Sequence, residues 1–223
     1  MKSSNASWYP CGASVRLPMR RMKAFWNRRL TVTITGSYFV CGATANGLVG
    51  THLIPHAIDR GIPEITAAAT VGVMGGPNFI GTTLSDWVID YVAAKKWLAL
   101  IYVLRALSLF ILPFVTDFSG LFIFAVIYGL DWFPTVAPTI AIASDTFGKR
   151  SVGIIYGWIF VFHQNGGAVA ATAAGAVRVS FGQYYYAFLA GGLMALIAAG
   201  LALSIRSRPL TPPLAGRTNA AHA

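Results

Sequence analysis

The chain has 223 residues, of which 56% are hydrophobic and only 11% are charged, and its formal net charge at pH 7 is +10. Soluble domains carry about 25% charged residues, so this chain has too few to cover a surface that faces water. Its mean hydropathy of +0.62 agrees. The composition therefore excludes an ordinary soluble domain. It predicts an all-α integral membrane protein, because several apolar stretches reach the length of about eighteen residues that a membrane-spanning helix needs.

The positive charge would suggest nucleic-acid binding in a soluble protein. In a membrane protein, lysine and arginine concentrate in loops that stay in the cytoplasm, and this explanation fits better. We therefore expect the lipid bilayer, and no nucleic acid, as a partner. The two cysteines, Cys11 in a basic segment and Cys41 in an apolar stretch, argue against a disulfide or a metal site.

The first element in chain order is a polar and basic segment, residues 1–29, which contains no acidic residue. An arginine-rich leader can be a targeting peptide, but the Arg20–Arg21 pair lacks the apolar region and the cleavage site of an export signal. We expect residues 1–29 to form a cytoplasmic segment ahead of the first membrane span.

Apolar stretches with short connections follow, and they predict six antiparallel membrane-spanning helices in one domain over residues 30–206. A polar tail, residues 207–223, comes after them. The expected spans are about 30–54, 65–89, 97–116, 119–143, 152–177 and 184–205.

Lysine and arginine are unevenly distributed between the two sides of these spans. Of the 17 lysines and arginines, all fall on the side of the N-terminal segment except Arg60 and Arg178 on the opposite side and Arg105 within a span. Because basic residues mark the cytoplasmic side, both termini are expected in the cytoplasm.

Two charged residues fall inside predicted spans. Arg105 lies about 12 Å along the third span, and Asp131 lies about 18 Å along the fourth, which runs in the opposite direction. Both are thus at middle depth, where a charge costs roughly 2.5–3.5 kcal/mol and usually has a partner or a function. The two residues could form a structural ion pair that joins two helices. Alternatively, one of them contacts an anionic substrate or exchanges a proton.

His163 is expected near the same depth, in the fifth span. A histidine in a membrane helix is more often a hydrogen-bonded packing residue than a proton carrier. Three ionisable groups at one depth on three helices nevertheless favour a central polar site that includes Arg105, Asp131 and His163. Gly153 and Gly157 have the spacing that lets helices approach closely.

Soluble-enzyme motifs are absent from the sequence. It contains no phosphate-binding glycine loop, no HExxH motif, no cysteine and histidine pairs with metal-ligand spacing and no nucleophile elbow. We expect no enzyme activity, no cofactor and no metal site.

The stretch DWVIDYVAAKK, residues 86–96, resembles a cytoplasmic loop motif of the major facilitator superfamily of transporters, G-x-x-x-D-R followed by basic residues. Asp90 takes the aspartate position and Lys95 and Lys96 take the basic end, whereas Asp86 stands at the glycine position and Tyr91 at the arginine position. In the family this loop acts as a conformational latch.

The resemblance extends over residues 30–206. This part of the chain is similar to the second six helices of bacterial members of the superfamily near monocarboxylate and oxalate/formate carriers. It implies a six-helix bundle that forms one half of a two-half transporter in the bacterial inner membrane. It also implies secondary active transport of a small solute, an organic anion such as a monocarboxylate, with a proton. Arg105 would then contact the carboxylate, and Asp131 or His163 would be proton-linked. The stretches that carry the resemblance are GLVGTHLIPHAIDRGI, PNFIGTTLS, IYGLDWFPTVAPT and DTFGKRSVGIIYGWIF.

Family members have twelve spans, and six are expected here. We therefore expect a half-length transporter that needs a second half, either another copy of this chain or a separate chain with the first six helices. The alternative is a truncated membrane remnant or an interaction protein without transport activity.

Overall fold

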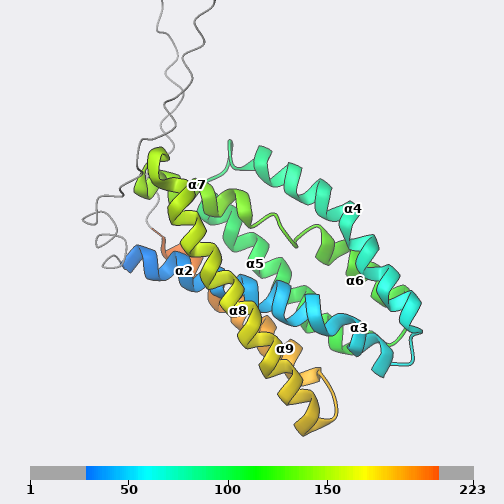
Figure 1. Cartoon of the computed structure of the whole chain (residues 1–223). Coiled ribbons are helices and arrows are strands. Elements are labelled where there is room, and N and C mark those ends of the chain that lie inside the picture. The colour runs from blue at the N-terminus through cyan, green and yellow to red at the C-terminus, as the bar shows by residue number, and fades with distance from the viewer. Residues whose placement is uncertain (1–28, 206–223) are drawn as a thin grey trace, which may run out of the picture.

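The structure is a computed structural model that describes residues 29–205, and every regular element within this range is a helix (Figure 1). The predicted N-terminal segment, apart from Arg29, and the predicted tail lie outside the described residues.

Three helical elements open the described chain without a break between them. They are α2 (Arg29–Gly42), the π-helix η1 (Ala43–Val49) and α3 (Gly50–Asp59). The remaining elements are α4 (Glu64–Val88), α5 (Ala94–Ile111), the 3₁₀ turn η2 (Leu112–Phe114), α6 (Phe118–Gly129), α7 (Val136–Phe147), the 3₁₀ turn η3 (Lys149–Ser151), α8 (Val152–Phe181) and α9 (Tyr185–Ser204).

Helices occupy all of the predicted spans, with two differences. The first predicted span continues through Pro55 to Asp59. The fourth is divided at residues 130–135 into α6 and α7. Within residues 29–205, two helices are long and apolar enough to cross a membrane by themselves, Ala94–Phe114 and Tyr185–Ser204. An all-helical membrane protein is thus supported, while the six-span arrangement stays a prediction.

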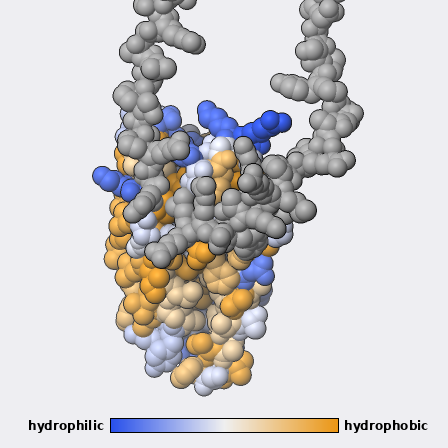
Figure 2. All heavy atoms as spheres, turned by 90° about the vertical axis from the view of Figure 1, so that its left-hand side faces the viewer, coloured by the Kyte–Doolittle hydropathy of each residue, from blue (hydrophilic) through white to orange (hydrophobic). Residues whose placement is uncertain are grey.

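The helices pack along their lengths in pairs. The most extensive pairings are α5 with α9, α2 and η1 with α8, and α4 with α6. The face seen in Figure 2 is largely apolar (orange), and its most hydrophilic residues lie mainly toward the upper end of the view. Phe79, Ile111 and Ile197 are 74%, 59% and 61% exposed. Such side chains are unfavourable in water but suit contact with lipid or with other apolar helices.

Glycine lets α2 and η1 approach α8 at backbone distance. A Cβ atom on Gly42 would overlap the carbonyl group of His163, and one on Gly166 would overlap that of Phe39. At Gly153 and Gly157, whose spacing also suits close approach, no described atom outside the local chain lies within 4 Å of a Cβ placed there, so no other described helix packs on them. Spacing alone could not identify which glycines of α8 face α2.

Candidate functional site

Arg105 and Asp131 form an ion pair in the interior of the helix bundle. The guanidinium Nε of Arg105 donates to Asp131 Oδ2 at 3.0 Å. Arg105 is completely buried and Asp131 is 4% exposed. The predicted pairing of these two residues is therefore present in the structure. A buried charge is tolerated only when it is paired and hydrogen-bonded, and this one is both.

The other donors of Arg105 are also occupied. Its Nη2 donates to the backbone carbonyl oxygens of Asp131 at 2.6 Å and Trp132 at 3.0 Å, and Nη1 contacts Cys41 Sγ at 2.9 Å. The rings of Tyr102 and Tyr128 lie 6.0 and 5.8 Å from the guanidinium carbon. In this conformation Arg105 has no exposed surface with which to contact a solute.

The break between α6 and α7 brings Asp131 to Arg105. The chain leaves helical geometry over residues 130–135, which frees the backbone carbonyl groups that Arg105 binds. Side chains of α4 stabilise the break from the other side. Asn78 Oδ1 accepts from the backbone N–H of Phe133 at 3.1 Å, and Ser85 Oγ donates to the carbonyl oxygen of Pro134 at 2.7 Å. Non-helical backbone among apolar helices is tolerable here because protein groups satisfy it.

Trp132, which lies within the break, has an unpaired donor. Its indole Nε1 is buried and has no hydrogen-bond partner among the described residues. Buried donors of this kind are rare in folded proteins, since each costs about 1–3 kcal/mol. An additional hydrogen-bond donor is therefore present one residue from Asp131.

A second polar group lies where η1 contacts α8, and it consists of Asn46, His163 and Gln164. We call it the Asn46 cluster. Asn46 Nδ2 lies 3.2 Å from His163 Nε2 and donates to Gln164 Oε1 at 3.0 Å. His163 Nδ1 lies 3.2 Å from the carbonyl oxygen of Tyr38. His163 is 6% exposed, Asn46 is half-buried and Gln164 is exposed. The cluster thus links a buried titratable ring to the molecular surface.

The helix α2 connects the two polar groups. Cys41, which Arg105 contacts, lies three residues after Tyr38, which stacks on His163 with ring centroids 4.7 Å apart. The structure therefore places Arg105, which is paired with Asp131, and His163 against neighbouring turns of α2.

The predicted latch residues lie away from these groups, in the last turn of α4, in the turn that follows and in the first turn of α5. Asp86 and Asp90 are exposed, and within residues 29–205 the structure shows no hydrogen bond or ion pair of their carboxylates. Tyr91 is 68% exposed and packs on Trp87, with ring centroids 4.8 Å apart. Lys95 Nζ donates to the carbonyl oxygen of Ile205 at 3.1 Å, and Lys96 is exposed.

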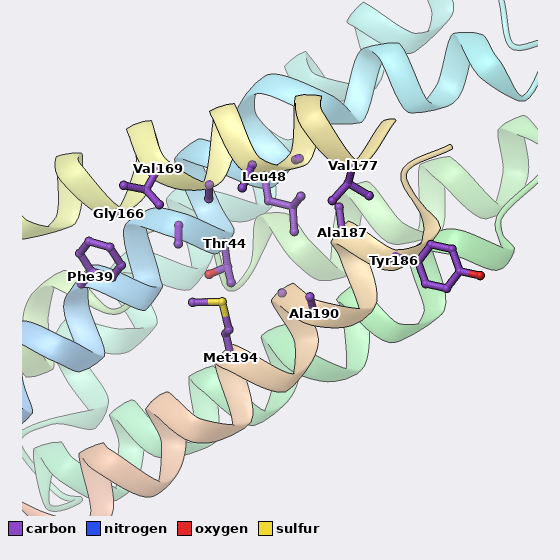
Figure 3. Close-up of a pocket in the computed structure, with 15 residues that line it drawn as sticks. Phe39, Thr44, Leu48, Gly166, Val169, Val177, Tyr186, Ala187, Ala190 and Met194 are labelled. Atoms are coloured by element: carbon purple, nitrogen blue, oxygen red, sulfur yellow. The ribbon is translucent and has the colours of Figure 1, made fainter. Parts of the chain in front are cut away.

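An apolar cavity of about 180 Å³ lies on another side of α8, facing α2, η1 and α9 (Figure 3). Thr44 and Met194 project toward it in Figure 3. Gln164 does not line it, and the lining positions of α8 begin at Gly166. Its lining residues are Phe39, Ala43, Thr44, Leu48, Gly166, Val169, Ala170, Ala173, Ala174, Val177, Tyr186, Ala187, Ala190, Gly191 and Met194.

Sequence reasoning did not identify Cys41, Asn46 or Gln164 as parts of these groups. Polar side chains at middle depth in apolar stretches were the available signal for Asn46 and Gln164. Nothing in the sequence indicates the π-helix that turns Asn46 toward α8. Within residues 29–205, no group of three or more histidine, cysteine, aspartate or glutamate side chains is placed to hold a metal ion.

Comparison with known proteins supports a transporter. No family model matches the chain. It is 27% identical over 69% of its length to an uncharacterised MFS-type transporter, YcxA, of Bacillus subtilis, and covers 39% of that protein. It is 25% identical over 77% of its length to monocarboxylate transporter 12-B of Danio rerio, covering 36% of it. It is 27% identical over 63% of its length to monocarboxylate transporter 12 of Xenopus laevis, covering 32% of it.

The predicted resemblance to major facilitator and monocarboxylate transporters is thereby confirmed. The chain spans less than two fifths of the length of these relatives. Transporters of this kind are integral membrane proteins, in agreement with the apolar helices α5 and α9.

Proposed function

We propose that this chain is one six-helix half of a secondary active transporter that moves a small organic anion, such as a monocarboxylate, together with a proton. Its similarity to MFS-type and monocarboxylate transporters supports the transporter role. The observation that carries the proposal is the buried ion pair Arg105–Asp131, next to a titratable His163, inside apolar helices. Ionisable groups in such a setting mark substrate or proton pathways.

A second half would complete the substrate site, which in two-half transporters lies at mid-membrane between the halves. Another copy of this chain or a separate chain could supply it. The chain covers 39% and 36% of two of its relatives, which leaves room for such a half. The glycines Gly72, Gly75, Gly76, Gly153 and Gly157 face open space, so α4 and α8 have surfaces on which further helices could pack closely.

The proposed roles follow from burial. The Asn46 cluster, through His163 and Gln164, meets the solute and the proton first, because it reaches the surface. Arg105 binds the carboxylate in another conformation of the cycle, in which the break at residues 130–135 moves and Asp131 releases the guanidinium. The free indole N–H of Trp132 supplies a second donor to the same carboxylate.

The turn between α4 and α5 is proposed as a weakened latch of the transport cycle, with Asp90 as its acid and Lys95 and Lys96 as its basic end. Asp86 and Tyr91 stand where the family motif has glycine and arginine. Replacing them together, Asp86→Gly with Tyr91→Arg, should raise transport or thermal stability. If neither changes, the latch proposal for this turn fails.

We further propose that the protein spans the bacterial inner membrane several times with both termini in the cytoplasm. The distribution of lysine and arginine supports this orientation.

A transport-inactive membrane remnant or interaction protein is the second candidate. The complete pairing of Arg105 favours it, because a fully satisfied ion pair can serve structure alone.

Uptake into vesicles tests the two candidates. The full chain, alone and mixed with a separately produced first-half chain, is reconstituted and supplied with labelled monocarboxylates under an imposed pH gradient. We expect uptake that Arg105→Ala, Asp131→Asn and His163→Gln each reduce at least tenfold, while the control Thr83→Ala on the exposed side of α4 leaves it unchanged. Unchanged uptake in both Arg105→Ala and Asp131→Asn would refute the assigned roles. A strictly monomeric chain by native mass measurement, with no uptake in either preparation, would favour the remnant.

A further inference from the structure

The hydrogen bonds of the Asn46 cluster match one protonation state of His163 when the Asn46 amide is oriented as in the structure. A backbone carbonyl oxygen can only accept, so the contact of His163 Nδ1 with the carbonyl of Tyr38 requires a proton on Nδ1. An amide NH₂ group can only donate, so the contact of Asn46 Nδ2 with His163 Nε2 requires an unprotonated Nε2. With the Asn46 amide in this orientation, the two contacts match a neutral ring in the Nδ1–H tautomer.

Asn46 uses both hydrogens of its amide in this arrangement. One goes to His163 Nε2 and the other to Gln164 Oε1 at 3.0 Å. Gln164 therefore directs its carbonyl oxygen toward Asn46 and its NH₂ group toward the exposed surface, since Gln164 is exposed.

A proton on His163 Nε2 is incompatible with this arrangement, because two donors would then face each other. Rotating the Asn46 amide by half a turn places its Oδ1 toward Nε2–H. The same Oδ1 can accept from Gln164 if the Gln164 amide also turns and offers its NH₂ group. Every bond of the cluster is then made again with reversed direction, and Gln164 presents its carbonyl oxygen to the surface.

We propose that Asn46 is a positioning residue that couples the protonation of His163 to the orientation of the Gln164 amide. One proton, donated by hydronium to the lone pair of His163 Nε2 with release of water, reverses the hydrogen-bonding group that the exposed Gln164 offers. The proposal deepens the proposed function, because it describes how the same site would respond to protonation. The coupling itself exists whether or not transport occurs.

The local structure holds Asn46 in place for this role. Asn46 lies in the π-helix η1, a geometry that occurs often at functional sites because it redirects side chains. Backbone contacts on both sides of it, Gly42 with His163 and Gly47 with Gly167, fix η1 against α8. The amide can therefore turn about its own axis without moving away from His163.

The titratable groups around the ring are few. On α2 they are Tyr38, whose hydroxyl bonds that of Tyr156 at 2.8 Å, and Cys41. Arg105 of α5 reaches Cys41 and is neutralised by Asp131. In the described part of the chain, no hydrogen bond, ion pair or ring contact joins His163 to an ionisable side chain of α3, α7 or α9. Asn46 is thus the amide donor that opposes protonation of Nε2 in this structure.

Nuclear magnetic resonance of the full chain in lipid nanodiscs tests the coupling. The chain has four histidines and two glutamines, Gln164 and Gln183, so selective ¹⁵N labelling gives few signals, which His163→Gln and Gln164→Ala assign. At neutral pH we expect His163 as the Nδ1–H tautomer. On acidification the His163 ring and the Gln164 side-chain amide should shift with one common midpoint, while the amide of Gln183 should not follow it.

Two variants separate coupling from simple packing. Asn46→Leu should abolish the response of the Gln164 amide to acidification, and Asn46→Asp should favour a proton on Nε2, because a carboxylate accepts from Nε2–H. The matched control is Asn165→Leu, since Asn165 is exposed on α8 and bonds only within its own helix, to the carbonyl of Val161 at 2.7 Å.

The proposal is overturned by a Nε2–H tautomer at neutral pH, by a His163 that takes up no proton while the protein stays folded, or by a Gln164 amide that does not follow His163 in the unchanged chain. Absence of uptake in vesicles, by contrast, would overturn the proposed function and leave these signals as expected.

Discussion

A completely buried guanidinium such as that of Arg105 has lost its hydration, and the protein must replace it with fixed acceptors. Asp131 supplies the countercharge, and the carbonyl groups of Asp131 and Trp132 supply further acceptors. Removing one partner leaves the other charge buried without a countercharge. Removing both eliminates the desolvation cost of the two charges together with their mutual attraction.

We therefore expect Arg105→Met to lower the free energy of unfolding by about 3–5 kcal/mol, and the double variant Arg105→Met with Asp131→Asn to lose less than Arg105→Met alone. Thermal unfolding in detergent measures both, in a double-mutant cycle. Losses that simply add would show that the two side chains do not stabilise each other.

Glycine substitutions test the close contact of α2 with α8. In Gly42→Ala the new Cβ would overlap backbone atoms of His163, which cannot move independently of α8. We expect a loss of about 1–3 kcal/mol, as for other overpacked sites. Gly200→Ala is the matched control, because no described atom outside the local chain lies within 4 Å of that position and alanine favours the helix by about 1 kcal/mol. Equal melting temperatures for the two variants would contradict the packing.

At the scale of elements, the break between α6 and α7 depends on a chain of hydrogen bonds from two other helices. Trp97 Nε1 of α5 donates to Ser85 Oγ of α4 at 2.8 Å, and Ser85 donates to the carbonyl oxygen of Pro134 at 2.7 Å. Ser85 is buried, so neither bond can be replaced by water without rearrangement. The position of Asp131 is thus set by side chains that are distant in sequence.

Ser85→Ala should cost about 1–3 kcal/mol, because it leaves Trp97 Nε1 and the Pro134 carbonyl without this partner. Thr83→Ala serves as the control, since Thr83 is exposed and bonds only to the carbonyl of Phe79 in its own helix. Urea or thermal unfolding in detergent distinguishes them. A Ser85→Ala protein as stable as Thr83→Ala would mean that the break holds its shape without this chain.

At the scale of the whole molecule, one end is tied together by the last turn of α3. Arg60, which follows that turn, donates to the carbonyl oxygen of Pro113 at 2.7 Å, and Asp59 pairs with Arg178 of α8 at 2.6 Å. His56, one turn earlier, is buried against Phe188 of α9, with ring centroids 5.0 Å apart, and its Nε2 has no hydrogen-bond partner among the described residues. This end therefore joins α3 to η2, α8 and α9.

Acidification should lower the stability of the contacts that α3 makes at this end of the molecule. Burial lowers the pKa of His56, and the hydrogen bonds from Arg178 lower the pKa of Asp59. In both cases the unfolded chain binds a proton more readily than the folded one, so stability falls as pH falls. The contribution of His56 to this loss of stability begins as the pH falls below its ordinary pKa of about 6.5, and that of Asp59 begins below about 3.9.

We expect the melting temperature in detergent to decrease between pH 7 and pH 5, and to decrease less in His56→Phe, which keeps an aromatic ring against Phe188 but cannot take up a proton. His52→Gln is the control, because His52 already bonds the carbonyl of Ala171 at 2.9 Å. The same slope in the unchanged chain and in His56→Phe would exclude His56 as the cause.

The sequence by itself determined the membrane class and the positions of the helical stretches, and it predicts one depth for Arg105, Asp131 and His163. These follow from hydrophobicity and from the rise of a helix, which depend on local composition and spacing. The pairing of Arg105 with Asp131 was also predictable, because two opposite charges at one depth on consecutive helices have few alternatives. The similarity to monocarboxylate transporters was evident from short stretches such as IYGLDWFPTVAPT.

Only the tertiary structure decided which side of each helix faces which neighbour. It placed Gly42 and Gly166, and neither Gly153 nor Gly157, at the α2–α8 contact, and it turned Asn46 toward His163 through a π-helix. It also showed that Arg105 is fully paired and that Asp86 and Asp90 are exposed. In an apolar helix every face is hydrophobic, so the sequence has no amphipathic pattern to mark the buried side, and backbone contacts between helices select it.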